Sequence, residues 1–193
     1  MQAGVIASRC MYVCKCKRKC TAAAIQNLLC LFAGYFIPEN PKLYFGFSGI
    51  VFKRLVKSPK VYVRDTGLLH GLLNINSTDE LLSHPVAGAS WEGYVLEQIA
   101  ACKNPQLQLH YYRTHDGAEC DAVLVKGIKP VACIEIKLSN APTVSKGYLH
   151  CIDDLKPVYK GVVTPQSENY TAQHGVQVTG LKTFLKEQLP LIK

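Results

Sequence analysis

Three strand-like runs follow one another between residues 107 and 138, and only short turns separate them. Between the first two runs, His115-Asp116-Gly117 is a turn of the kind that closes a hairpin, and Lys126-Gly127 turns the chain again. Connections this short join antiparallel neighbours. The sequence therefore predicts two successive antiparallel hairpins, built from Leu107 to Thr114, Ala118 to Val125 and Pro130 to Leu138.

Helical patterns flank these strands on both sides. Residues 89–103 form the best helix in the chain, and Gly88 is expected just outside its start. After the third strand the pattern predicts a helix at 143–153, strands at 158–163 and 176–179, and a closing helix at 181–189. The order αβββαβ, followed by a short strand and a helix, predicts an α/β fold with a mixed β-sheet flanked by helices.

The residues before 86 are expected to form shorter and less regular elements. Residues 1–20 show no amphipathic period and are expected to be poorly ordered, 22–37 are expected to form a helix, and 43–52 look strand-like. Residues 66–73 are expected to form a short helix, and Ser77-Thr78-Asp79-Glu80 is a capping box that opens another. We therefore expect an N-terminal basic and apolar segment over 1–54, a connector over 55–85, and a domain over 86–193.

The formal net charge of +8 suggests nucleic acid as a partner, but its distribution weakens that interpretation. Residues 1–60 contain ten Lys or Arg and one acidic residue, whereas residues 61–193 contain twelve basic and thirteen acidic residues. Phosphate binding needs basic side chains focused on one face. The overall charge cannot establish such a face.

Nine cysteines are many for 193 residues, and five of them lie in the first 30. The other four are spread through helix-like and strand-like segments, where single cysteines usually act as small reduced hydrophobes. Cys10-x3-Cys14-x-Cys16-x3-Cys20 is open to two interpretations, a zinc site or reduced thiols without a metal. The absence of a regular disulfide framework indicates a cytoplasmic protein.

An apolar stretch from Thr21 to Ile37 follows the basic residues 17–19. Its length is at the short limit for a membrane span, and Gln26 and Asn27 interrupt it. We expect a buried helix and no membrane association, with a membrane or export segment as the alternative.

Carboxylates occur on two of the predicted strands. Because side chains alternate along a strand, Glu119, Asp121 and Val123 are expected to share one face. On the next strand, Glu135 and Lys137 are expected to share a face with Cys133. The hairpin can then bring Asp121 close to Glu135, and like charges at one place favour a divalent cation such as Mg²⁺.

Two further residues complete the predicted site. Lys137 can orient or deprotonate a metal-bound water, or stabilise charge on a phosphate. Glu92 has Ala89, Val95 and Leu96 as its helical neighbours, so its carboxylate lies on an apolar stripe and needs a partner. If that helix packs on the sheet, Glu92 points toward Asp121 and Glu135. Single strand carboxylates are more often merely solvated, and the order of all four residues is what favours a pocket.

The arrangement of Glu on a helix, then Asp, then Glu-x-Lys on adjacent strands resembles the PD-(D/E)XK phosphodiesterase superfamily. The longer sequence around these residues is similar to a domain of unknown function found at the C-terminus of prokaryotic AAA-type ATPases. That similarity covers roughly residues 55–190 and is carried by residues 57–69 (KSPKVYVRDTGLL), Trp91-Glu92-Gly93-Tyr94-Val95, Tyr112-Arg113-Thr114, Glu119-Cys120-Asp121 and Ile134-Glu135-Ile136-Lys137.

The resemblance implies a restriction-endonuclease-like core after a winged-helix-like connector at 55–85. It also implies catalytic roles for Glu92, Asp121, Glu135 and Lys137, with Mg²⁺ or Mn²⁺ held by the three carboxylates, and DNA as substrate. The chain contains no Gly-x-x-x-x-Gly-Lys-Ser/Thr loop, so an ATPase module would have to be supplied separately. The alternatives are a catalytically inert interaction or regulatory module, or a truncated product in which residues 1–45 are a remnant.

Overall fold

The structure is a computed structural model, and it describes residues 42–44, 54–56, 60–63 and 65–193. The expectations for residues 1–20, for the helix at 22–37, for the zinc site at Cys10–Cys20 and for most of the strand at 43–52 lie outside these residues. The first described elements are a two-stranded antiparallel sheet of β1 (Lys42–Tyr44) and β2 (Lys60–Tyr62), and the short helices α2 (Thr66–Leu72) and α3 (Thr78–Ser83).

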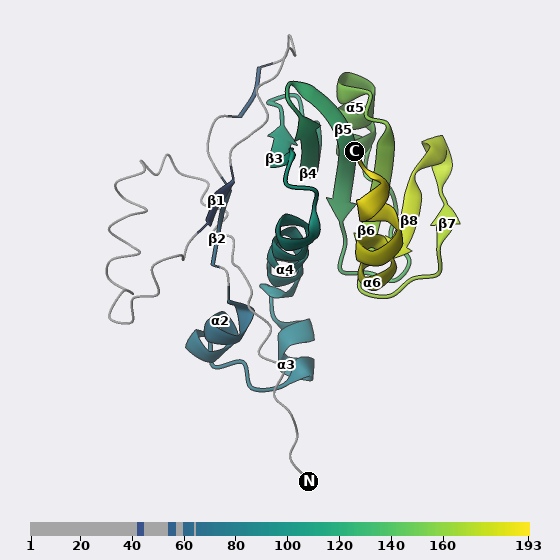
Figure 1. The fold of residues 1–193 in the computed structure, drawn as a ribbon. Coiled ribbons are helices and arrows are strands. Elements are labelled where there is room, and N and C mark those ends of the chain that lie inside the picture. Colours follow the sequence, from purple (N-terminus) through teal and green to yellow (C-terminus); the bar gives the residue numbers. More distant parts are fainter. Residues whose placement is uncertain (1–41, 45–53, 57–59, 64) are drawn as a thin grey trace.

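A six-stranded sheet forms the centre of the molecule, and its strand order is β3-β4-β5-β6-β8-β7 (Figure 1). Strands β3, β4 and β5 pair antiparallel, β5, β6 and β8 pair parallel, and β7 returns antiparallel on β8. This confirms the predicted α/β class with a mixed sheet. The strands are β3 (Leu107–Arg113), β4 (Glu119–Lys126), β5 (Lys129–Ile136), β6 (Tyr159–Thr164), β7 (Tyr170–Thr171) and β8 (Gln177–Gly180).

Helices cover the two faces of this sheet (Figure 1). On one face α4 (Ala87–Cys102) and the C-terminal helical segment enclose an apolar cluster that includes Leu96, Ile134 and Phe184. On the other face α5 (Lys146–Leu155) packs over a second cluster that includes Cys133 and Tyr148. Because Cys133 and Ile134 are neighbours on β5, the alternation of that strand supplies both cores.

Helices α4 and α5 begin a few residues away from their predicted first residues. Ser145 caps α5 by accepting the N–H of Tyr148, so this helix begins at Lys146 and not at Thr143. Helix α4 begins at Ala87, which places Gly88 inside it. Ser77 accepts the N–H of Glu80, as a capping box requires, but the Glu80 carboxylate returns to the N–H of Asn76.

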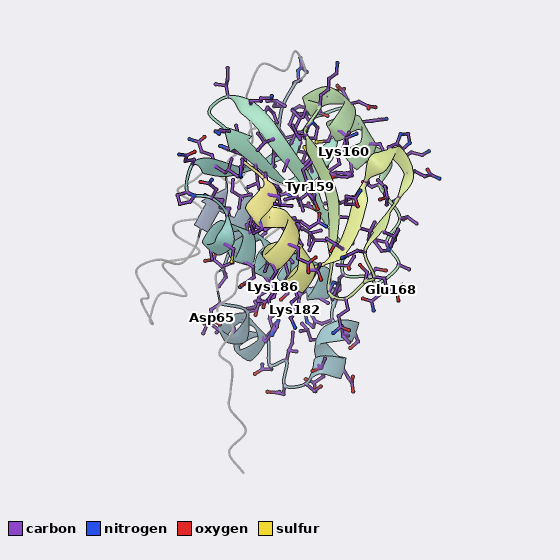
Figure 2. The ribbon with its side chains drawn as sticks, turned by 45° about the vertical axis from the view of Figure 1, so that its right-hand side comes forward. Asp65, Tyr159, Lys160, Glu168, Lys182 and Lys186 are labelled. Atoms are coloured by element: carbon purple, nitrogen blue, oxygen red, sulfur yellow. The ribbon has the colours of Figure 1, made fainter. Side chains whose placement is uncertain are left out.

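The C-terminal segment is less regular than the single helix expected for it. It consists of α6 (Leu181–Thr183), a π-helical turn (Phe184–Gln188) and a 3₁₀ turn (Leu189–Leu191). Three of its apolar side chains, Leu181, Phe184 and Leu189, are buried, whereas Lys182 and Lys186 are exposed on its outer side (Figure 2). The short strand β7 and a 3₁₀ turn at Gln173–Gly175 were not expected from the sequence.

Both edges of the large sheet have distinctive pairing. At the β3 edge, Leu55 forms an antiparallel bridge with Thr114, and the N–H of Val56 donates to the carbonyl of Arg113. At the other edge, β7 is only two residues long. Among the described residues, no helix has the length and apolar character needed to cross a membrane.

Candidate functional site

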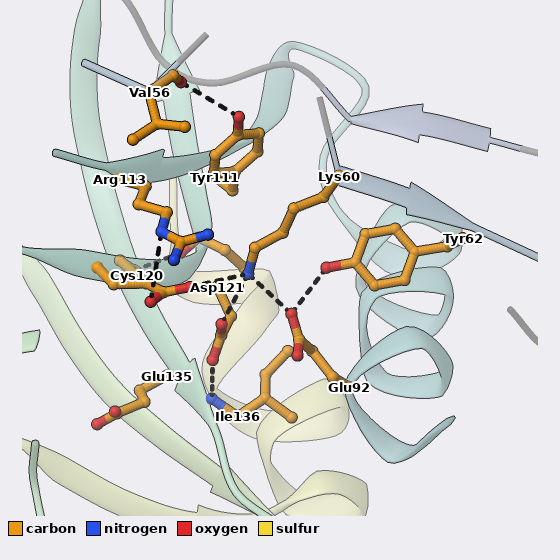
Figure 3. A network of polar contacts seen from close by, with 12 residues as sticks. Val56, Lys60, Tyr62, Glu92, Tyr111, Arg113, Cys120, Asp121, Glu135 and Ile136 are labelled. Carbon is orange, nitrogen blue, oxygen red and sulfur yellow. Dashed lines mark hydrogen bonds and ion pairs between the residues drawn. The ribbon is translucent and has the colours of Figure 1, made fainter. Parts of the chain in front are cut away.

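A largely buried lysine joins the carboxylates of three residues at the α4 side of the sheet (Figure 3). The Nζ of Lys60 lies 2.9 Å from Oε1 of Glu92, 3.0 Å from Oδ1 of Asp121 and 3.6 Å from Oε1 of Glu119. Lys60 comes from β2, Glu92 from α4, and the other two from β4. One ammonium group therefore connects three elements that are far apart in the sequence.

Tyr62, two residues after Lys60 on β2, contacts the same site. Its hydroxyl donates to Oε1 of Glu92 at 2.7 Å, and its side chain is fully buried. The ring of Tyr111 lies beside the ammonium of Lys60, 5.6 Å from Nζ to the ring centroid. Neither Lys60 nor Tyr62 was expected to be a site residue. Their spacing of two residues on a strand was the signal that could have placed both on one face.

Asp121 reaches this site because β4 contains a bulge. The register between β3 and β4 shifts so that Asp121 and Ala122 together lie opposite Tyr111. The bulge sends Asp121 toward α4 and turns Val123 into the cluster under α5. The expectation that Asp121 and Val123 share a face is therefore wrong. The second carboxylate oxygen of Asp121 accepts the N–H of Ile136 at 3.0 Å.

Glu135 and Lys137 form a separate ion pair, 2.9 Å from Oε1 to Nζ. The Glu135 side chain is nearly buried, and its other oxygen accepts the N–H of Ser145 at a long 3.5 Å. In Figure 3 the carboxylate of Glu135 points away from Lys60. Glu135 and Lys137 thus interact directly, although β5 ends at Ile136 and Lys137 follows it.

The structure thus divides the four predicted residues into two neighbouring pairs. Lys60 bridges Glu92 and Asp121, and Lys137 binds Glu135. The carboxylates of Glu92, Asp121 and Glu135 do not form a group of ligand atoms within 4.8 Å of one another; among the described residues only three cysteines form such a group.

The Lys60 site contains more carboxylates than ammonium groups, and burial and this excess of negative charge together shift the pKa values of Glu92 and Lys60. Burial raises the pKa of Glu92, and the nearby charge of Asp121 raises it further. The charge of Lys60 and the hydrogen bonds from Lys60 and Tyr62 offset this only in part. Burial alone would lower the pKa of Lys60, but the charges of Asp121 and Glu92 outweigh it and raise that pKa. One ammonium cannot neutralise two buried carboxylates.

The pKa of Lys137, in the neighbouring Glu135–Lys137 pair, is raised for similar reasons. Burial would lower its pKa, but the hydrogen bond and charge of Glu135 raise it, with smaller contributions from Asp121 and Glu119. Lys137 is therefore a stable cation. It can hold an anionic group or a water molecule more readily than it can accept a proton.

The donor set suits a hard divalent ion, because Glu92 and Asp121 offer carboxylate oxygens of the kind that Mg²⁺ and Mn²⁺ prefer. However, the ammonium of Lys60 already lies at hydrogen-bonding distance from both carboxylates. A metal ion can bind Glu92 and Asp121 together only if Lys60 moves aside. The carboxylates of Glu92 and Asp121 are suitable ligands for Mg²⁺ or Mn²⁺, and the Lys60 ammonium competes with the metal ion for them.

Comparison with known proteins places most of this site in a recognised sequence family. Residues 87–184 match a family model described as a domain of unknown function (DUF4143). Over 118 residues the chain is 41% identical to the uncharacterized proteins Mb2031c of Mycobacterium bovis and Rv2008c of Mycobacterium tuberculosis. These alignments cover 61% of this chain and 26% of each relative, so the chain matches about a quarter of their length. No solved structure matches the chain.

Proposed function

The chain belongs to the DUF4143 family, and we propose that its domain is a nuclease-like module that hydrolyses phosphodiester bonds in DNA with Mg²⁺ or Mn²⁺. One observation carries the proposal. Glu92 and Asp121, from a helix and a strand 29 positions apart in the sequence, meet around a single cation, and the Glu135–Lys137 pair lies beside them. A PD-(D/E)XK core with the order αβββαβ would produce this arrangement.

The chain's own groups have distinct roles in this proposal. Glu92 and Asp121 hold the ion, which when bound supplies Lewis-acid polarisation of a phosphate oxygen. Glu135 positions Lys137 through their ion pair. Lys137, as a cation, orients the attacking water or stabilises the negative charge that develops on the phosphate. Arg113, exposed and 3.8 Å from Glu119, can contact the DNA backbone at the margin of the site.

A nuclease assay on the full chain tests the proposal. With Mn²⁺ and single- or double-stranded DNA, we expect metal-dependent cleavage that Asp121→Asn and Lys137→Ala reduce by more than about a hundredfold. Lys182→Ala is the matched control, since it removes an exposed lysine far from the site in the sequence. Cleavage that persists in both site variants would refute the proposed site.

The position of Lys60 favours a second candidate, a catalytically inert interaction or regulatory module. If the ammonium of Lys60 permanently replaces the metal, the domain binds no Mn²⁺ and serves an ATPase subunit supplied separately. Thermal melts with and without Mn²⁺ separate the two functions. A Mn²⁺-dependent rise in melting temperature that Asp121→Asn abolishes supports the nuclease, and an unchanged melting temperature supports the inert module.

A further inference from the structure

Three cysteines meet inside the core between the sheet and α5. Cys120 lies on β4, Cys133 on β5 and Cys151 on α5, and their sulfur atoms all lie within 4.8 Å of one another. The sulfurs of Cys133 and Cys151 are 3.9 Å apart. We propose that these three thiols form a binding site for a soft, univalent metal ion of the copper(I) class.

The spacing of the sulfurs suits three-coordinate binding. An ion at the centre of three sulfurs, with bonds of about 2.3 Å as in zinc thiolates, separates those sulfurs by roughly 4.0 Å. The observed distance between Cys133 and Cys151 is close to this value, and Cys120 has to move only slightly. Copper(I) accepts such a set, and soft thiolates select it over hard ions. Structural zinc requires a fourth ligand. Among the described residues, the group contains only these three.

The surroundings of the thiols favour an ion of low charge. All three cysteines are at most 1% exposed, and they belong to an apolar cluster with Val123, Tyr148 and other residues. One copper(I) ion bound to three thiols with the loss of one proton leaves the site neutral. A divalent ion reaches the same neutrality only if a second of these buried thiols loses its proton, and ionising a buried group is costly in an apolar interior.

The chain also holds the thiols in place before an ion binds. Cys133 pairs with Val123 in the β4–β5 ladder, and the hydroxyl of Tyr148 donates to the carbonyl of Cys133 from α5. The sulfur of Cys120 makes only weak contacts, with the carbonyls of Ala122 and Ile134 and with the thiols of Cys133 and Cys151. Binding therefore replaces weak sulfur contacts and requires little ordering of the chain. Because the thiols are buried, loading requires α5 to lift from the sheet, and uptake should be slow.

Copper(I) titration tests the site. The probe is copper(I) held under anaerobic conditions by a competing chelator, added to the full chain with its five N-terminal cysteines replaced by serine: Cys10, Cys14, Cys16, Cys20 and Cys30. We expect one equivalent to bind slowly, with a thiolate-to-copper absorption band in the ultraviolet. Replacing Cys133 or Cys151 by alanine should weaken binding by more than about tenfold.

Two controls make the outcome specific. Cys102→Ala removes an exposed thiol outside the group and should leave binding unchanged. Lys182→Ala, at an exposed position in the C-terminal segment, should also leave it unchanged. Neither Glu92 nor Asp121 is one of the three ligands, so failure of the nuclease proposal would not affect this one. Circular dichroism verifies that each variant is folded, and serine variants replace any alanine variant that is not. Equal copper(I) affinity in the Cys133 and Cys102 variants, or no uptake at all by the folded parent, would overturn the proposal.

Discussion

At the scale of single residues, the distinctive feature is a cation built into the chain between two carboxylates. The side chains of Lys60, Glu92 and Asp121 are only 11%, 14% and 15% exposed, so solvent screens their charges weakly. The Lys60 ammonium therefore stabilises both carboxylates. Losing it would leave two buried negative charges with no ammonium between them.

Replacing Lys60 by methionine tests this role. The apolar stem is retained while the charge is lost, and we expect the free energy of unfolding to fall by about 3–5 kcal/mol at pH 7. Urea denaturation measures the change, with Lys182→Met as the exposed control. If Mn²⁺ competes with the ammonium, it should raise the melting temperature of Lys60→Met more than that of the wild type. Loss of less than about 1 kcal/mol would show that the pair is no stronger than a surface salt bridge.

The pKa of Glu92 gives a prediction about pH. Because folding raises this pKa above its ordinary value of 4.5, the protonated carboxyl favours the folded state. Its contribution is fully present below pH 4.5 and is lost as the pH rises through the raised pKa. Relative to Glu92→Gln, the wild type should therefore lose stability as the pH rises from 4.5.

Urea melts of both proteins across that pH range measure the difference. Glu187→Gln, at an exposed position in the C-terminal segment, serves as the control for loss of a carboxylate. A stability difference between wild type and Glu92→Gln that stays constant with pH would contradict the raised pKa.

The sequence predicted part of this site and missed its central residue. Glu92 was found because a carboxylate on an apolar helical stripe needs a partner, and Glu135 and Lys137 were found because they share a strand face. The position of Asp121 depended on a bulge that strict alternation cannot predict. Lys60 was missed because its partners lie 32 and 61 residues away, and no local pattern reports contacts at that separation.

At the scale of elements, the contact between α5 and the β3–β4 turn is especially close. A Cβ added to Gly147 in the first turn of α5 would lie 2.7 Å from the carbonyl oxygen of Gly117. Gly117 itself has a φ of +89°, which favours glycine in that turn. Helix and turn can approach this closely only because Gly147 lacks a side chain.

Gly147→Ala should therefore destabilise the fold by about 1–3 kcal/mol, because the backbone atom that it meets cannot rotate away. Gly88→Ala is the matched control, since a Cβ there would meet nothing within 4 Å and Gly88 lies in helix α4. That change should instead stabilise by about 0.5–1 kcal/mol. Thermal denaturation compares the two variants, and equal effects would contradict the close contact.

The order of the elements was more predictable than their ends. Short turns and alternating strands specified β3, β4 and β5, and helical periodicity specified α4. The two-residue strand β7 carries no periodic pattern, and it exists because it pairs with β8. The π-helical turn at Phe184–Gln188 likewise reflects the packing of Phe184 against the sheet, which helix propensity does not encode.

At the scale of the whole molecule, two apolar clusters share the central strands, whereas the small helices contribute little. Helix α3 has no buried residue, and α2 buries only Thr66 and Leu69. Strand β5, in contrast, is buried from Val131 to Ile136 and pairs on both sides. Stability should therefore be concentrated in the sheet and low in the segment before α4.

Hydrogen exchange followed by mass spectrometry tests this distribution. Amides of β4, β5 and β6 should exchange only through global unfolding, and those of α3 should exchange orders of magnitude faster. The protection of α3 should also be insensitive to Gly147→Ala, while that of β5 should fall with global stability. Protection of α3 equal to that of β5 would indicate that the connector and the sheet unfold as one unit.

The pairing at the two sheet edges bears on how the protein behaves at high concentration. Exposed edge strands recruit strands from other molecules and start aggregation. Here residues 54–56 pair with the end of β3, and the opposite edge ends in a strand too short to template another chain. Each margin therefore resists fibril growth, and a shortened version that begins after residue 56 should precipitate more readily than the full chain.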